Sequence, residues 1–140
     1  MTIKYTNIKA KMDDLTALSS IEPEAVLATL AQRYSEDNIY TKSGSVLIAM
    51  NPYKSLPIYG DDALDKFQRN SLIGSDSPHI YAMAAEMYNA LAEHGRSQAI
   101  IISGESGAGK TETARFVLRY MRFASKRKGC ELEKCINASQ

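Results

Sequence analysis

The feature that most limits the folds open to this chain is a glycine-rich segment that joins two regular patterns. Before it, residues 98–103 contain an Ala-Ile-Ile-Ile run without polar alternation, which is typical of a central parallel strand covered on both faces. After it, Val117 and Met121 belong to an apolar series at helical spacing, which predicts a helix over about residues 110–125. The order of strand, glycine loop and helix predicts an α/β fold of the P-loop type.

The glycine-rich segment matches a phosphate-binding pattern. Residues 104–111 read Gly-Glu-Ser-Gly-Ala-Gly-Lys-Thr, which fits Gly, four residues, Gly, Lys and Ser or Thr. Glycines let consecutive backbone N–H groups turn toward an anion, and the helix that follows adds its own free N–H groups and positive dipole end. We therefore expect a site for a nucleoside triphosphate formed by Gly104, Glu105, Ser106, Gly107, Ala108, Gly109, Lys110 and Thr111.

Two side chains of this loop carry the expected chemistry. Lys110 should reach the β- and γ-phosphates and neutralise charge on the transferred group, which makes it the candidate catalytic residue. The Thr111 hydroxyl should ligate a Mg²⁺ ion that bridges those phosphates. A glycine-rich turn with an incidental lysine is the alternative, and the flanking strand and helix patterns argue against it.

The segments before the loop predict a helix and a hairpin. Apolar positions recur at helical spacing over residues 22–34, and Pro23 suits the first turn of such a helix. A strand-and-turn signal at residues 38–44 comes before an apolar run at residues 45–50. Together these two stretches predict a hairpin whose second strand is buried.

The middle of the chain predicts a connection and then a second helix. Residues 54–77 are rich in Gly, Asp, Ser and Asn, so we expect a surface connection with a brief helical possibility at residues 62–69. Ser77 is the expected N-cap of the next helix, with Pro78 at its first position. That helix is expected to stop at Gly95.

Composition and charge exclude several classes of partner. The chain has 140 residues, of which 44% are hydrophobic, and this is enough to form the core of one domain. A net charge of +1 gives no reason to expect nucleic acid or a membrane as partner. No apolar stretch approaches the roughly 20 residues of a membrane helix, and the N-terminus lacks a secretory signal, so we expect a cytoplasmic protein.

Cys130 and Cys135 are expected to be reduced, incidental thiols, with half of a zinc site as the alternative.

Hydrolysis needs groups that the sequence after the loop does not offer. P-loop enzymes hold Mg²⁺ with a carboxylate on a neighbouring strand and use a further group to orient the attacking water. No aspartate follows Asp76, and a second parallel strand does not fit behind the helix that follows the loop. We therefore expect a truncated gene product or a fragment.

Several stretches of the chain match one family in the same order. They are the glycine loop with the Glu-Thr that follows it, and the segments at residues 13–19, 39–44, 46–54, 56–59 and 78–81. This set resembles the myosin heavy-chain motor domain over about residues 13–122. The resemblance implies a partial motor domain with a mixed sheet at residues 13–125, an N-terminal extension at residues 1–12, and a charged loop or frayed tail at residues 126–140.

The resemblance also implies a function and a second group of site residues. Family members carry out actin-activated ATP hydrolysis with Mg²⁺ and move along actin filaments, so it implies ATP as substrate, actin as partner and association with the cytoskeleton. The family's adenine pocket is lined by an Asn-Pro-aromatic-Lys segment and a nearby tyrosine. In this chain the matching residues are Asn51, Pro52, Tyr53, Lys54 and Tyr59.

Two other functions compete with the ATP-binding part of a motor. The segments that sense the γ-phosphate and the actin-binding cleft are not among the matched stretches, which favours a truncated, non-hydrolysing nucleotide-binding or interaction fragment. An unrelated P-loop kinase or GTPase is the third reading, and it predicts no adenine-pocket segment upstream. Arg115, Arg119 and Arg122 share one helix face, which we interpret as solvated, with an anionic partner as the alternative.

Overall fold

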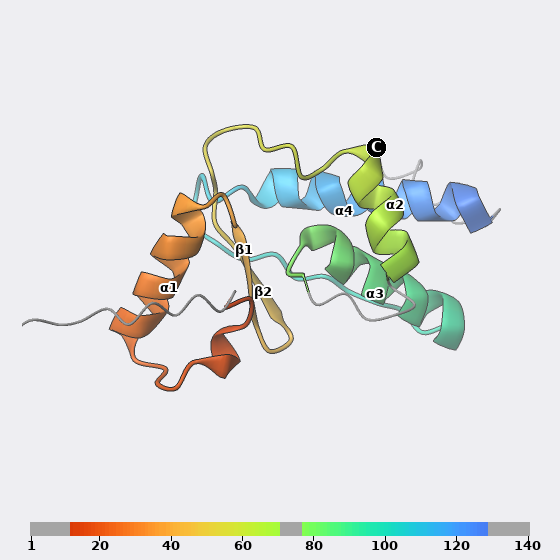
Figure 1. Cartoon of the computed structure of the whole chain (residues 1–140). Coiled ribbons are helices and arrows are strands. Elements are labelled where there is room, and N and C mark those ends of the chain that lie inside the picture. Colours follow the sequence, from red (N-terminus) through yellow and green to blue (C-terminus); the bar gives the residue numbers. More distant parts are fainter. Residues whose placement is uncertain (1–11, 71–76, 129–140) are drawn as a thin grey trace, which may run out of the picture.

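The computed structural model describes residues 12–70 and 77–128 and combines a hairpin with four α-helices. The elements follow in the order η1 (Leu15–Ala17), α1 (Pro23–Ser35), β1 (Tyr40–Ser43), β2 (Val46–Ala49), α2 (Asp61–Asn70), α3 (Ile80–His94) and α4 (Lys110–Lys128). Helix α1 lies on one side of the hairpin, and α2, α3 and α4 gather on the other (Figure 1). No helix of the described part is long and apolar enough to cross a bilayer.

The hairpin confirms the prediction from residues 38–50 and is fastened to α1 by a buried arginine. Strands β1 and β2 pair antiparallel, with Tyr40 opposite Ala49. The Arg33 guanidinium donates to the Tyr40 carbonyl oxygen at 2.7 Å and forms an ion pair with Asp13 at 2.8 Å. Because a buried charge must be paired and hydrogen-bonded, this arrangement fixes α1 and residue 13 against β1.

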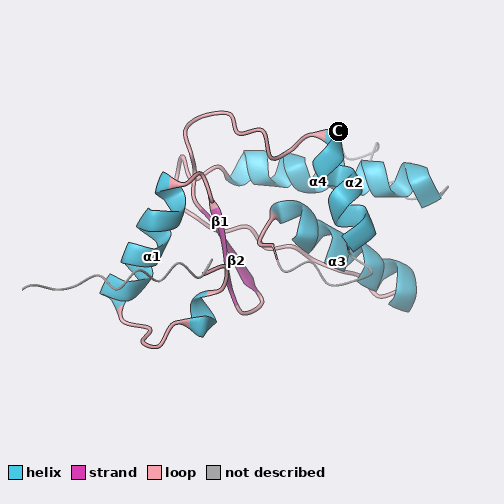
Figure 2. Ribbon diagram, viewed as in Figure 1, coloured by secondary structure: helices cyan, strands magenta, loops and turns pink. Residues whose placement is uncertain are grey.

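The three helices beyond the hairpin form the core together with it. Helices α3 and α4 lie against each other, and α2 lies across both of them (Figures 1 and 2). Tyr81 of α3 is wholly buried, and Tyr120 of α4 is 1% exposed. The interior is therefore built largely from aromatic rings and small residues of α3.

The helix predictions are confirmed for α1, α3 and α4, with a correction at the start of α3. Pro23 does begin α1, and Gly95 ends α3 in the left-handed conformation at φ 61°. The N-cap of α3 is His79, whose side chain accepts from the Tyr81 N–H, so the prediction of Ser77 as cap and Pro78 as first helical residue was wrong. The imidazole takes the cap because packing against neighbouring rings holds it there.

The helical possibility at residues 62–69 is confirmed, whereas the surface character predicted for this stretch was wrong. The brief helical possibility is a full helix, α2, and Leu64 and Phe67 are only 2% and 4% exposed. The composition, rich in turn residues, did not reveal the burial, because only two apolar residues three positions apart anchor this short amphipathic helix.

The predicted central strand is not formed, and neither is the mixed sheet. Residues 98–103 are a connection without secondary structure, and Ile101 is 92% exposed. Within residues 12–70 and 77–128, the sheet consists of β1 and β2 alone. The second strand is also less buried than expected, since Val46 is 60% exposed. A β-branched run becomes a strand only where a neighbouring strand accepts its backbone hydrogen bonds.

The His79 ring lies at the centre of the aromatic core and is buried in its neutral form. Its Nδ1 accepts from the Tyr81 N–H at 3.0 Å, so Nε2 carries the proton and donates to the Ile58 carbonyl at 3.1 Å. The ring stacks on Phe67 with centroids 4.6 Å apart. Burial lowers the pKa of His79 from 6.5 to about 4, with a smaller effect from the positive charge of Lys66.

This lowered pKa predicts a loss of stability in mild acid. Because the unfolded chain takes up a proton near pH 6.5 and the folded chain only near pH 4, this contribution is complete above pH 6.5 and falls between those values. At pH 4.5 the loss should be about 2–3 kcal/mol of unfolding free energy, measured by urea denaturation. His79→Asn keeps a capping acceptor and removes the titration, so the variant should lose less stability than the parent over the same range. An equal loss in both proteins would contradict the assignment.

Candidate functional site

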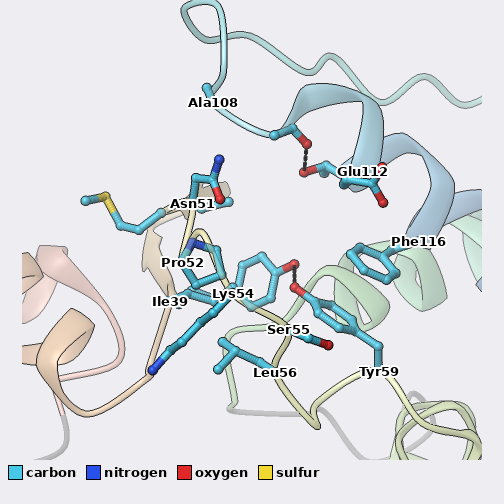
Figure 3. A pocket seen from close by; sticks show the side chains of 15 residues that line it. Ile39, Asn51, Pro52, Lys54, Ser55, Leu56, Tyr59, Ala108, Glu112 and Phe116 are labelled. Atoms are coloured by element: carbon cyan, nitrogen blue, oxygen red, sulfur yellow. Dashed lines mark hydrogen bonds between the residues drawn. The ribbon is translucent and has the colours of Figure 1, made fainter.

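A cavity of about 200 Å³ lies between the end of the hairpin and the start of α4. Its walls come from the hairpin and the segment after it (residues 39–40, 49–52, 54–56 and 59), from residues 108–109 of the glycine loop and from the first turns of α4. Figure 3 shows Asn51 and Pro52 on one side of it, and Glu112 and Phe116 on the other. Segments far apart in the sequence are thus joined at one hollow beside the glycine loop.

The glycine loop is tightly turned. Gly107 and Gly109 have φ of 80° and 90°, a region that favours glycine. A Cβ atom on Gly104 would lie 3.0 Å from the Cβ of Ala108, a contact so close that Ala108 would have to shift. The backbone conformation therefore explains glycine at residues 107 and 109, and close packing explains it at residue 104.

Lys110 reaches back across the loop from the first residue of α4. Its Nζ donates to the carbonyl oxygens of Gly104 and Glu105 at 2.7 and 2.8 Å. An ammonium group has three donors, so one remains for another acceptor. The N–H groups in the first turn of α4 have no intrahelical acceptor and point toward the same region. The loop thus brings a cation and a helix N-terminus to one place.

Asn51 connects the hairpin to the loop. Its Nδ2 donates to the Gly107 carbonyl at 2.7 Å, and its Oδ1 accepts from the Tyr53 N–H at 3.0 Å. The side chain therefore holds the end of β2 against the crest of the loop. The sequence predicted that Asn51 contacts the base of a nucleotide. In the structure its side-chain amide donor is instead bonded to the backbone of the loop.

The other upstream residues do not all lie at the cavity. Pro52, Lys54 and Tyr59 line it. Tyr53 does not, because its backbone adopts φ 50° and its side chain is 83% exposed. Lys54 forms an ion pair with Asp37 at 2.6 Å.

The wall opposite the loop is aromatic and uncharged. The Tyr59 ring stacks on Phe116 with centroids 3.6 Å apart, and the Tyr59 hydroxyl lies 2.8 Å from the Tyr40 hydroxyl (Figure 3). Burial raises the pKa of both tyrosines, so both hydroxyls are protonated at neutral pH. Tyr40 and Phe116 were missed as lining residues because helical or strand periodicity does not distinguish a core position from a cavity wall.

The candidate metal ligand occupies the first turn of α4. Thr111 is exposed there, directly after Lys110. In the described residues there is no group of three or more His, Cys, Asp or Glu side chains that could hold a metal ion. Cys130 and Cys135 lie outside the described residues. The Thr111 side chain offers a single neutral oxygen. Such a ligand suits a hard cation that takes its other ligands from phosphate and water.

Two arginines of the predicted stripe have carboxylate partners on the same chain. Arg119 of α4 forms an ion pair with Asp61 of α2 at 2.9 Å, and Arg115 pairs with Glu112 one turn earlier. Both pairs are exposed, so each is worth at most about 1 kcal/mol.

Comparison with known proteins identifies the family. The family described as myosin head (motor domain) matches residues 12–139. Unconventional myosin-Vc of Homo sapiens is 50% identical over 125 residues, which are 89% of this chain and 7% of that protein. Myosin-4 of Arabidopsis thaliana is 48% identical over 79% of this chain and 9% of its own length, and Myosin-J heavy chain of Dictyostelium discoideum is 44% identical over 84% and 5%.

The chain therefore belongs to the myosin motor-domain family, which confirms the resemblance of the sequence segments. It spans less than a tenth of the length of these three relatives. The match includes the glycine loop, the hairpin and α4, the elements that surround the cavity.

Removal of the Asn51 amide donor should loosen the loop without unfolding the chain. Asn51→Asp keeps an acceptor for the Tyr53 N–H but sets a carboxylate oxygen against the Gly107 carbonyl. We expect faster amide hydrogen exchange over residues 105–109 and a loss of about 1 kcal/mol in unfolding free energy. Asn38→Asp is the matched control, because the Asn38 side-chain amide donates to exposed Glu36, away from the loop, and this variant should leave exchange in the loop unchanged. The same rates in both variants would mean that the Asn51 bond does not hold the loop.

Proposed function

We propose that this chain is the ATP-binding portion of an actin-based myosin motor, which couples ATP hydrolysis to movement along actin filaments. The observation that carries the proposal is the hydrogen bond from Asn51 to the Gly107 carbonyl, which joins a phosphate-type loop to an aromatic cavity. A nucleotide needs both parts, since its phosphates require donors and its base requires a flat apolar surface. Family membership supports the same reading.

The phosphates belong at the glycine loop. Backbone N–H groups at residues 104–109, the N-terminus of α4 and the Lys110 ammonium combine there, and each favours negative charge. Residues 104–109 would contact the phosphate chain through their backbone, so Glu105 and Ser106 would contribute their N–H groups. Ala108 would contribute its own after releasing the Glu105 carbonyl, to which it donates at 3.2 Å. Lys110 exchanges its two carbonyl acceptors for phosphate oxygens and stabilises the charge on the transferred group, which is its catalytic role.

The base belongs in the cavity of about 200 Å³ beyond the loop. Pro52, Lys54 and Tyr59 supply its surface, and Asn51 forms the border with the loop. Tyr53 belongs to the proposed adenine pocket only through the family pattern. Its exposed side chain would have to turn toward the base.

Mg²⁺ fits this site as a partner of the nucleotide. Thr111 would hold it through the hydroxyl oxygen, and the ion would supply positive charge that offsets the charge of the phosphates. The chain's own contribution is one oxygen, placed by the first turn of α4.

In the cell, we propose a cytoplasmic, cytoskeleton-associated protein that works as part of a myosin complex with actin filaments. The relatives named above are myosins, and the family supports this assignment. The charge of the chain supports neither nucleic acid nor a membrane as partner.

Removal of the Lys110 ammonium tests the phosphate site. Titration with a fluorescent ATP analogue and Mg²⁺ should show that Lys110→Ala weakens binding at least tenfold, because charge-assisted hydrogen bonds to phosphate are lost. Lys66→Ala removes an equal charge from the exposed face of α2 and should bind like the parent. Unchanged affinity in Lys110→Ala, with the parent shown to bind, would refute the site. Phosphate release recorded in the same titration separates a hydrolysing motor portion from a non-hydrolysing nucleotide-binding fragment.

Removal of the Thr111 hydroxyl tests the metal ligand. Thr111→Val has nearly the same shape but no oxygen, so Mg²⁺ should increase its affinity for the nucleotide less than it does in the parent. Thr111→Ser restores the hydroxyl and should restore the response. The measurement is nucleotide affinity with Mg²⁺ and with EDTA for all three proteins. The same ratio in Thr111→Val and the parent would exclude Thr111 as a ligand.

A further inference from the structure

The stretch between β2 and α2 forms much of the cavity wall but has no regular structure of its own. Residues 50–60 contain turns and bends and neither helix nor strand. Tyr59, which lines the cavity, lies near the end of this stretch. Its position therefore depends on contacts with other elements.

The start of α3 holds this stretch at two consecutive carbonyl groups. The His79 Nε2 donates to the Ile58 carbonyl at 3.1 Å, and the Tyr81 hydroxyl donates to the Tyr59 carbonyl at 3.1 Å. The Tyr81 N–H donates to the His79 Nδ1 at 3.0 Å, which leaves the Nε2 proton for Ile58. We call His79 and Tyr81 together the α3 clamp.

Both residues of the α3 clamp are buried, so each has little freedom to move. His79 is 7% exposed and stacks on Phe67 of α2, and Tyr81 is 0% exposed. A close-packed interior keeps such side chains in one conformation. A buried donor without an acceptor also costs free energy, so the clamp favours the one position of residues 58–59 that satisfies both donors.

The α3 clamp reaches the cavity through the ring of Tyr59. This ring lies parallel to the Phe116 ring, with centroids 3.6 Å apart (Figure 3). The Tyr81 ring stands edge-on to both, at centroid distances of 6.1 Å from Tyr59 and 6.4 Å from Phe116. His79 and Tyr81 are not among the residues that line the cavity. The clamp therefore acts from behind the aromatic wall.

We propose that His79 and Tyr81 are positioning residues for the base of the nucleotide. This inference rests on the proposed function, which places the base against Tyr59. The clamp fixes residues 58–59, and with them the Tyr59 ring, before the base arrives. An aromatic surface that is already in place spares the base the cost of ordering it. The phosphates bind to the glycine loop instead, so loss of the clamp should weaken binding of the base and leave binding of the phosphates intact.

Two ligands separate this role from a general effect on stability. ATP carries the base and the phosphates, whereas inorganic triphosphate carries the phosphates alone, and both are titrated with Mg²⁺ by isothermal titration calorimetry. Tyr81→Phe keeps the buried ring and removes the hydroxyl. It should weaken ATP binding about threefold to tenfold, the range expected for one lost hydrogen bond, and leave triphosphate binding unchanged. Tyr120→Phe removes a hydroxyl from a neighbouring buried ring and should bind both ligands like the parent.

A second variant and a second measurement test the α3 clamp by another route. His79→Asn keeps an acceptor for the Tyr81 N–H, but its side chain is too short to reach the Ile58 carbonyl. It should also weaken ATP binding and leave triphosphate binding unchanged, and it decides the question if Tyr81→Phe does not fold. The nuclear Overhauser effect between the ring protons of Tyr59 and Phe116 needs no nucleotide. It should lose intensity in both clamp variants and keep it in Tyr120→Phe.

The outcomes distinguish the α3 clamp from the proposed function. ATP affinity equal to that of the parent in both clamp variants would overturn the proposal, and so would an equal loss of affinity for ATP and for triphosphate. A parent that binds neither ligand would contradict the proposed function. In that case the signal between Tyr59 and Phe116 still tests the clamp, and unchanged intensity in both variants would overturn it.

Discussion

The arrangement of this protein depends on the complete burial of one side chain, Tyr81. It is 0% exposed, and its hydroxyl donates to the Tyr59 carbonyl at 3.1 Å. Five rings lie around it with centroids 5.0–6.4 Å from its own, namely Tyr59, Phe67, His79, Phe116 and Tyr120. Burial of a large aromatic ring stabilises a fold by roughly 2–3 kcal/mol, and here it also fixes positions. Because Tyr59 and Phe116 both touch Tyr81, the same packing that forms the core sets the aromatic wall of the cavity.

Those parts of the fold that depend on local signals were predictable from the sequence. Pro23 begins α1, Gly95 ends α3 in the left-handed conformation, and the apolar run after Gly44 forms the second strand of a hairpin. The strand expected at residues 98–103 depends on a distant partner, and no local pattern reveals whether that partner is in place. The prediction of the N-cap of α3 was wrong for a related reason. A Ser-Pro pair is a strong local signal, but the buried His79 ring is held at the cap by packing that the sequence does not display.

The residues of the candidate site also differ in how far the sequence could predict them. The glycine loop was recognised because its spacing reflects a backbone geometry, and Gly107 and Gly109 have the positive φ that this geometry requires. The upstream segment was found only through a family resemblance, and that resemblance transfers residue types rather than conformations. It could not show that the Asn51 Oδ1 would accept from the Tyr53 N–H and leave the Tyr53 ring in solvent. Phe116 was not predicted to line the cavity, because the spacing of apolar residues in a helix does not mark where the core opens into a cavity.

The glycine loop is held unequally at its two ends. At residues 107–111 it is fixed by α4 and by the Asn51 bond to the Gly107 carbonyl. At Gly104 it continues from residues 98–103, which have no strand partner in the described part of the chain. The Lys110 side chain connects the two ends of the loop. It starts on α4, and its ammonium donates to the carbonyls of Gly104 and Glu105. The residue proposed to bind phosphate is therefore also the one that restrains the Gly104 end of the loop. If Lys110 turns to a phosphate, the Gly104 end of the loop must be held by the phosphate itself or by hydrogen bonds to residues 98–103. The conformation of residues 98–103 would then affect phosphate binding.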